Sequence, residues 1–250
     1  METDMDLSRE LVDGIPLLWV APPVAGGLLI HVPAFGQAKE AATPVLEAAV
    51  SRGLIAVAID AYQHGERGTE DRETLTRRVF SNFRREMWTI IGETVLDMPR
   101  VATWARARFG SDLKLHLTGL SMGGDVAVAA APLFDAIASV NAVIATPDWQ
   151  RPGMRDLKTD ELVDQGEPDA KAMLFFDVLE PLSHADRYTG LPIHFINGAA
   201  DRHVPPDGAR RFKALVGEAH NSIVITEKPE MGHLDFIDPK TWLNDLKFGF

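Results

Sequence analysis

Residues 113–131 read LKLHLTGLSMGGDVAVAAA, and this stretch decides the fold. Its apolar first part predicts a strand over 113–118, and its alanine- and valine-rich last part predicts a helix over 122–131. The helix follows the strand at once, so Ser121 must lie on a sharp turn between them. Glycines stand two positions before and two positions after this serine, which lets the neighbouring backbones pass closely. The turn would therefore project the serine hydroxyl from the end of a strand.

A serine in this position is suited to nucleophilic catalysis. Serine is a weak nucleophile unless its oxygen stands exposed beside a base. The start of the following helix directs backbone N–H groups, including that of Met122, toward the place where an oxyanion would form. The alternative is a glycine-rich turn that only permits close packing of strand and helix.

A serine at such a turn predicts an acid and then a histidine later in the chain, each on a loop after a strand. Asp201 follows a predicted strand over 191–196, and His233 follows a predicted strand over 222–226. Both residues would lie at the carboxyl edge of a parallel sheet, beside Ser121. We therefore expect Ser121, His233 and Asp201 to form a catalytic triad.

Two alternatives to this triad remain open at the level of sequence. Asp148 follows a predicted strand over 140–145 and is a second candidate for the acid. His203 lies only two residues from Asp201, which is a poor position for the partner of that acid. The histidines and carboxylates show no metal-ligand spacing such as H-x-x-x-H, so no metal site is expected.

The rest of the chain alternates strands and helices, which predicts a mostly parallel central sheet flanked by helices on both faces. Further strands are predicted over 15–20, 27–32 and 54–59, and further helices over 41–52, 206–216 and 239–247. The segment 71–109 is mostly helical in pattern, and Pro99 marks an expected break. With no repeat or long linker, residues 1–250 are expected to form one α/β domain.

Residues 148–188 interrupt this alternation with a connection far longer than usual. The segment contains two amphipathic stretches and several large apolar side chains, among them Trp149, Met173, Phe175 and Phe176. Long insertions of this kind are usually functional. We expect a small helical lid above the serine, with Trp149 as a substrate contact; the alternative is a helical excursion that only packs on the surface.

Composition excludes several classes of protein. The chain has 250 residues, 46% of them hydrophobic and 24% charged, which is ordinary for a globular protein. A net charge of −11 disfavours nucleic acid as a partner. The chain contains no cysteine, its first residues are acidic, and no apolar run approaches the ~20 residues of a membrane span. We expect a soluble cytoplasmic protein that does not bind membranes; a homodimer is left open.

Taken together, the serine turn, the GAAD motif ending at Asp201 and the MGH motif ending at His233 resemble the α/β-hydrolase superfamily. The resemblance covers nearly the whole chain apart from 148–188. Residues 60–68, DAYQHGERG, are similar to the corresponding segment of bacterial serine esterases and of dienelactone-hydrolase-like or acyl-peptidase-like members. In that class His64 would border the active site and contact substrate. The alternative is a tight glycine loop whose charged residues form structural ion pairs.

The resemblance also implies a second oxyanion donor after the strand over 27–32. Members of the class often carry His-Gly at this point, whereas this chain reads PAFGQAKE over 33–40. Aligning the two makes Phe35 the residue whose N–H donates, and its side chain a substrate contact. A shift of one position would give the role to Ala34.

These features predict a serine hydrolase, a carboxylesterase that cleaves a small-molecule ester of a small or medium acyl group through an acyl-enzyme and without a cofactor. Amide, peptide or thioester cleavage by the same triad is an alternative. A non-catalytic binding protein of the same fold is a second, since fold does not fix function.

Overall fold

In the computed structural model, which describes residues 6–217 and 222–248, eight strands form one sheet in the order β1-β2-β4-β3-β5-β6-β7-β8. The strands are β1 (Ser8–Val12), β2 (Ile15–Val20), β3 (Gly27–Val32), β4 (Leu54–Ile59), β5 (Lys114–Leu120), β6 (Ser139–Val143), β7 (Ile193–Gly198) and β8 (Ile223–Lys228). β2 pairs antiparallel with β1 and with β4, and every other neighbouring pair is parallel. The predicted mostly parallel sheet is confirmed.

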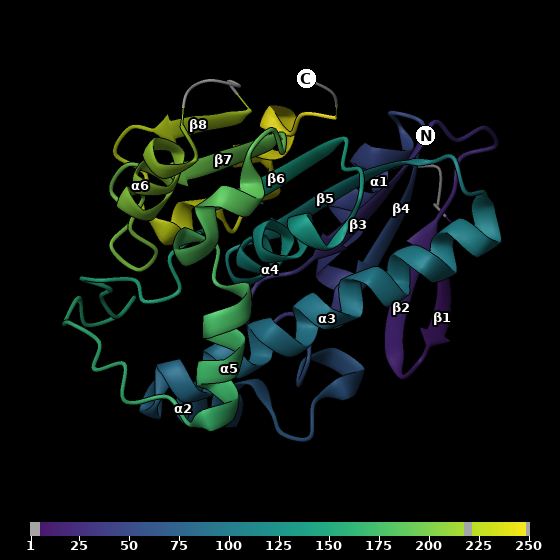
Figure 1. Cartoon of the computed structure of the whole chain (residues 1–250). Helices are drawn as coiled ribbons and strands as arrows, with labels where there is room; N and C mark the ends of the chain where they lie inside the picture. The colour runs from purple at the N-terminus through teal and green to yellow at the C-terminus, as the bar shows by residue number, and fades with distance from the viewer. Residues whose placement is uncertain (1–5, 218–221, 249–250) are drawn as a thin grey trace.

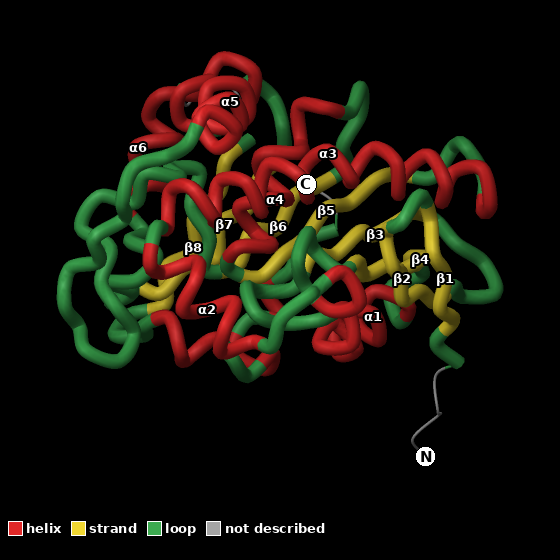
Figure 2. The backbone as a smooth tube through the Cα atoms, turned by 90° about the horizontal axis from the view of Figure 1, so that it is seen from below, coloured by secondary structure: helices red, strands yellow, loops and turns green. Residues whose placement is uncertain are grey.

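Helices cover both faces of this sheet (Figures 1 and 2). They are α1 (Thr43–Val50), α2 (Arg72–Ser81), α3 (Phe83–Phe109), α4 (Met122–Ala130), α5 (Ala170–Leu179) and α6 (Asp207–Val216). α3, α4 and α6 pack in the larger hydrophobic core on one face, whereas α1 and the C-terminal segment pack in a second core on the other. Each face of the sheet is therefore buried, which explains why strands such as LIAVAI over 54–59 are apolar throughout.

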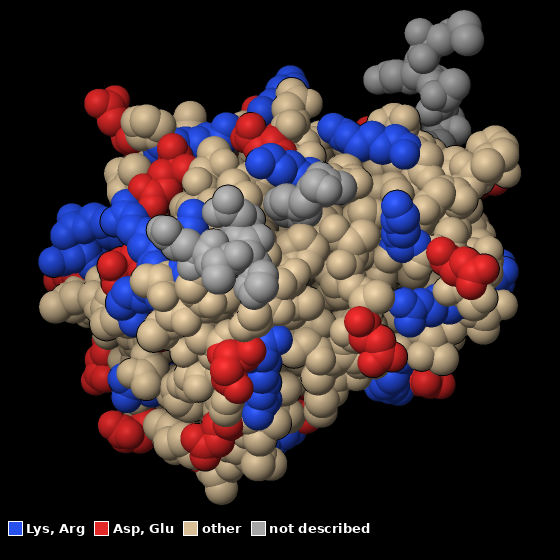
Figure 3. All heavy atoms as spheres, turned by 45° about the horizontal axis from the view of Figure 1, so that its top comes forward, with Lys and Arg blue, Asp and Glu red and all other residues tan. Residues whose placement is uncertain are grey.

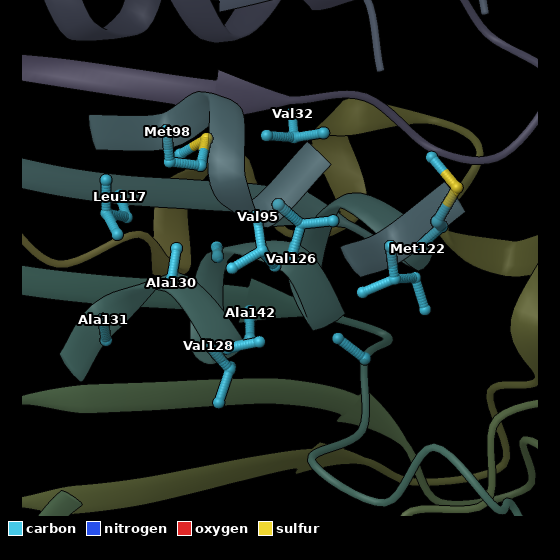
Figure 4. Close-up of a cluster of buried hydrophobic side chains, with 14 of the residues drawn as sticks. Val32, Val95, Met98, Leu117, Met122, Val126, Val128, Ala130, Ala131 and Ala142 are labelled. Atoms are coloured by element: carbon cyan, nitrogen blue, oxygen red, sulfur yellow. The ribbon is translucent and has the colours of Figure 1, made fainter. Parts of the chain in front are cut away.

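The serine turn leads into α4, which lies between the sheet and α3. Every residue of α4 is buried, so small side chains are needed for its close approach. Figure 4 shows Val126 and Val128 of this helix beside Val95 and Met98 of α3 and Ala142 of β6. Packing on both sides fixes the helix whose first turn borders Ser121.

The predicted helix break at Pro99 is wrong. α3 continues through Pro99, and the helical segment is interrupted at Asn82 instead. The Asn82 side chain accepts a hydrogen bond from the Arg85 N–H at 3.2 Å and so caps the start of α3. Burial of Met98 and Val101 on either side of the proline holds the helix together despite the missing backbone donor.

Two further elements differ from expectation. Residues 239–247 form two short 3-10 turns, Pro239–Thr241 and Leu243–Asp245, rather than one helix. Trp242 between them is 2% exposed, and its Nε1 donates to the Phe236 carbonyl at 3.0 Å. Burial of this side chain, rather than helical periodicity, therefore determines the conformation of the segment. The strand β1 was not expected; it pairs with β2 through a turn at Asp13 and Gly14.

The segment 148–188 is anchored mainly on α3. Its helix α5 lies across the N-terminal half of α3 (Figure 1). The Phe176 ring stacks on Trp88 with 4.4 Å between centroids, and Phe175 packs directly against Gly92, where a larger side chain would not fit. These contacts favour an anchoring role for the two phenylalanines. Closure of the segment over the serine as a lid stays a prediction.

Charged side chains of both signs are interspersed on the face of the molecule shown in Figure 3. Across the structure, several charged side chains form ion pairs, such as Arg210 with Glu227 at 2.5 Å and Arg211 with Asp207 at 2.6 Å. Within the part of the chain that the structure describes, no helix combines the length and the apolar character needed to span a bilayer.

Candidate active site

Ser121 lies on the sharp turn between β5 and α4, as the sequence predicted. Its backbone has φ 52° and ψ −119°, a conformation that is costly for any residue with a side chain and that occurs mainly at functional sites. Its N–H donates to the Val143 carbonyl at 2.8 Å, which ties the turn to β6. A Cβ on Gly119 would overlap the Gly123 backbone, and a Cβ on Gly123 would overlap the Val32 carbonyl. Both positions therefore require glycine.

The structure brings Ser121, His233 and Asp201 together at the carboxyl edge of the sheet. The Ser121 Oγ lies 3.2 Å from His233 Nε2, and His233 Nδ1 lies 2.7 Å from Asp201 Oδ2. The other oxygen of Asp201 accepts hydrogen bonds from the N–H groups of His203 and Val204 at 2.9 and 2.8 Å. Asp201 is thus a fully bonded acceptor that can orient the imidazole, as in serine triads.

Asp148, the alternative acid, faces other partners. Its Oδ2 pairs with Arg211 at 2.5 Å and its Oδ1 accepts the Gln150 N–H at 3.0 Å. Its carboxylate stabilises the loop after β6 and the start of α6. The histidine contacts Asp201, and not Asp148.

Two backbone N–H groups are free to hold an oxyanion. Among the described residues, neither Met122 nor Phe35 uses its N–H in a hydrogen bond. The Ala34 N–H, by contrast, donates to Gln37 Oε1 at 3.2 Å. The tight contact of Gly123 with the end of β3 brings the loop that carries Phe35 beside the first turn of α4. This arrangement favours Phe35 over Ala34 as the second donor.

A buried ion pair, Lys39 with Asp60, helps to hold that loop in place. The Lys39 N–H and Nζ donate to the two oxygens of Asp60 at 2.8 and 3.0 Å, and both side chains are almost fully buried. Lys39 Nζ also pairs with Glu66 at 2.5 Å, and Arg67 pairs with Asp97 at 2.5 Å. The charged residues of the segment 60–68 therefore act as structural partners, in keeping with the alternative interpretation of that segment.

The other two predicted substrate contacts are buried. His64 is 2% exposed, its Nδ1 donates to the Tyr62 carbonyl at 2.9 Å, and its ring lies 5.3 Å from that of Phe35. Burial lowers the pKa of His64. Trp149 is 1% exposed and packs in the hydrophobic core, while its carbonyl accepts from Trp88 Nε1 at 2.9 Å. Contact of either residue with substrate stays a prediction.

Two further aromatic rings lie near the three residues, and the sequence pattern did not mark either of them as part of the site. The His203 ring is 5.0 Å from that of His233, and the Phe80 ring is 5.8 Å from His203 and 6.0 Å from Phe35. Burial lowers the pKa of His203 to about 4, so this histidine is neutral at pH 7. Helical periodicity marks Phe80 only as an apolar position, because its neighbours come from distant parts of the chain.

A buried ion pair lies beneath the site. Asp125 in α4 accepts the Thr146 N–H at 2.8 Å and pairs with the Arg151 guanidinium. Asp125 is fully buried and Arg151 is 3% exposed. The pair joins the helix that follows Ser121 to the loop that follows β6. Within residues 6–217 and 222–248, no cluster of three or more histidine or carboxylate side chains could hold a metal ion.

Comparison with known proteins finds similarity in structure rather than in sequence. No protein-family model and no curated protein matches the chain. The structure is similar to that of TT1662 from Thermus thermophilus (TM-score 0.70, 22% identity, covering 96% of this chain and 98% of that one). It is also similar to the Pyrococcus furiosus esterase Pf2001 (TM-score 0.69, 16% identity, 97% and 90%). A third similar structure is Est1E from Butyrivibrio proteoclasticus with bound ferulic acid (TM-score 0.64, 16% identity, 95% of each chain). With this sheet order and these helices on its two faces, the chain has the α/β-hydrolase fold.

Proposed function

We propose that the protein is a serine hydrolase that cleaves a carboxylic ester of a small or medium acyl group. The observation that carries the proposal is the chain of hydrogen bonds from Ser121 through His233 to Asp201, which begins at a strained turn. Similar structures include one named an esterase and one with ferulic acid bound, which supports ester chemistry.

The geometry supports a two-step reaction. Ser121 Oγ attacks the ester carbonyl carbon while His233 Nε2 takes the hydroxyl proton. The negative oxygen of the tetrahedral intermediate accepts hydrogen bonds from the Met122 and Phe35 N–H groups. The intermediate then collapses, the carbon–oxygen bond to the alcohol breaks, and His233 gives its proton to the departing oxygen. Water then attacks the acyl-enzyme carbonyl while His233 takes a proton from it. His233 returns this proton to Ser121 Oγ as the carboxylic acid leaves.

The aromatic rings around the loop at Phe35 support a limited acyl size. Phe35 packs edge-on against both His64 and Phe80, so large side chains surround the proposed oxyanion donor. Each buried methylene of an acyl chain gains about 0.8 kcal/mol until the space is full, and overpacking then costs about 1–3 kcal/mol. We expect kcat/KM for p-nitrophenyl esters to rise from acetyl to butyryl or hexanoyl and to fall for longer chains. A maximum at lauroyl or palmitoyl would contradict the proposed acyl size.

Labelling with a fluorophosphonate tests the proposed chemistry directly. Intact mass and peptide mapping should place one adduct on Ser121 in the wild type and none in Ser121→Ala. Parallel assays with matched esters, thioesters and aminoacyl amides then identify the preferred bond. Absence of labelling after long exposure, together with no hydrolysis of any of these compounds, would favour a non-catalytic binding protein.

A further inference from the structure

A hollow of about 250 Å³ lies on the His233 side of the proposed triad. Its wall includes His233, His203 and Asp201, together with Leu157 and Leu234. In the proposed reaction His233 must stand beside the departing alcohol oxygen to protonate it. The alcohol part of the ester therefore leaves past His233, and this hollow, which His233 lines, is the candidate space for it.

His203, which lines this hollow, has an unused hydrogen-bond acceptor. Its Nδ1 lies 2.8 Å from the Arg155 carbonyl, which can only accept, so Nδ1 carries the proton. Because a neutral imidazole carries only one N–H, Nε2 is unprotonated and can accept a hydrogen bond. Nε2 has no hydrogen-bond partner among the described residues and, unlike Nε2 of His64, is not sealed from solvent.

The position of the His203 ring is fixed from several sides. Its backbone N–H donates to Asp201 at 2.9 Å, and its ring packs between His233 and Phe80. A side chain that is 8% exposed and anchored in this way loses little conformational entropy when it binds a partner. The other polar groups of the hollow already have partners: Asp160 pairs with Arg202 at 2.6 Å, and the Asp235 carboxylate accepts the Gly232 N–H at 2.7 Å.

We infer that His203 Nε2 is a specificity-determining acceptor for the alcohol part of the substrate, and that the preferred esters have alcohols bearing further hydroxyl groups, as glycerol and sugars do. The inference rests on the proposed function and adds the class of alcohol. A hydroxyl on the alcohol donates to Nε2 and holds the leaving oxygen beside His233. An alkyl alcohol of the same length leaves Nε2 without a partner once water is displaced, which is unfavourable.

Two esters with the same acyl group and the same carbon chain in the alcohol test this inference. We would measure kcat/KM for 1-monobutyrin and for n-propyl butyrate by pH-stat titration. The wild type should prefer monobutyrin by about 3- to 10-fold, the range expected for one net hydrogen bond. A ratio near 1 in the wild type would overturn the inference while the proposed ester hydrolysis stands. Hydrolysis of neither ester, without fluorophosphonate labelling, would overturn the proposed function and this inference with it.

Two substitutions distinguish the roles of the two ring nitrogens of His203. His203→Asn places an amide nitrogen near Nδ1, so it keeps the bond to the Arg155 carbonyl but has no acceptor at Nε2; the ratio should fall to about 1. His203→Gln places an amide oxygen near Nε2 and should recover part of the preference. His184→Asn, at a half-buried site outside the hollow, is the control and should keep the wild-type ratio. A wild-type ratio in His203→Asn, or a Gln variant no better than the Asn variant, would overturn the assignment.

Discussion

The two oxygens of Asp201 have different partners, and this difference predicts the effect of a single substitution. Oδ1 accepts two backbone N–H groups, so in Asp201→Asn the amide oxygen must take that position. The amide NH₂ then faces His233 Nδ1 and forces the proton onto Nε2, where the ring cannot accept from Ser121. We expect kcat to fall by about 10⁴-fold with little change in stability, the loss known for serine triads without this carboxylate. Steady-state kinetics and thermal unfolding would measure the two effects.

Asp148→Asn is the matched control for this substitution. Asp148 pairs with Arg211, and its carboxylate does not contact His233. Loss of the Asp148 carboxylate should lower the midpoint temperature of unfolding, while kcat should change less than tenfold. A larger loss of kcat in Asp148→Asn than in Asp201→Asn would show that the acid is assigned wrongly.

The backbone of Phe35 can be tested separately from its ring. Phe35→Ala keeps the N–H proposed to hold the oxyanion, whereas Phe35→Pro removes it. Loss of one oxyanion donor typically costs about 10²–10³ in kcat. We therefore expect Phe35→Pro to lose about that factor relative to Phe35→Ala, measured on p-nitrophenyl butyrate. Equal rates in the two variants would shift the donor role away from this residue.

At the scale of whole elements, the sequence was most informative where the pattern is local. The turn at Ser121 is visible because a strand, two glycines and a helix adjoin, and the structure shows why each glycine is needed. β1 was missed although Asp13-Gly14, both at positive φ, is a typical hairpin turn, because its strand is short and half polar. The positions of Phe80 and His203 beside the triad depend on tertiary contacts that no local pattern contains.

The buried Asp125–Arg151 pair joins two elements that border the site, and breaking it should be costly. Arg151→Met would leave the fully buried Asp125 carboxylate without a counter-charge. Removing one partner of such a pair typically costs about 3–5 kcal/mol of unfolding free energy. Arg210→Met breaks the exposed pair with Glu227 and should cost about 1 kcal/mol or less. Urea unfolding of both variants measures the difference, and equal costs would contradict the structural role of the buried pair.

The molecule as a whole buries several histidines in neutral form, which makes its stability depend on pH. Burial lowers the pKa of His31 to about 3 and that of His116, His194 and His203 to about 4. In the unfolded chain each of these groups has a pKa near 6.5. Between about pH 4 and 6.5 the unfolded state therefore binds more protons than the folded state. The free energy of unfolding should fall as the pH drops through this window and should not depend on these groups above about pH 7.5.

A single substitution can isolate one of these contributions. At pH 5.5, linkage predicts a loss of about 1 kcal/mol for each buried histidine relative to pH 7.5. His116, which is 2% exposed, shares a hydrogen bond of 2.8 Å with Ser139 Oγ, and in His116→Asn an amide that does not titrate can replace that bond. Urea unfolding of wild type and variant at both pH values gives a double difference in which the remaining groups cancel. The variant should lose about 1 kcal/mol less than the wild type on acidification, because its unfolded state no longer gains the proton at this position; an equal loss in both proteins would show that His116 is not held neutral by burial.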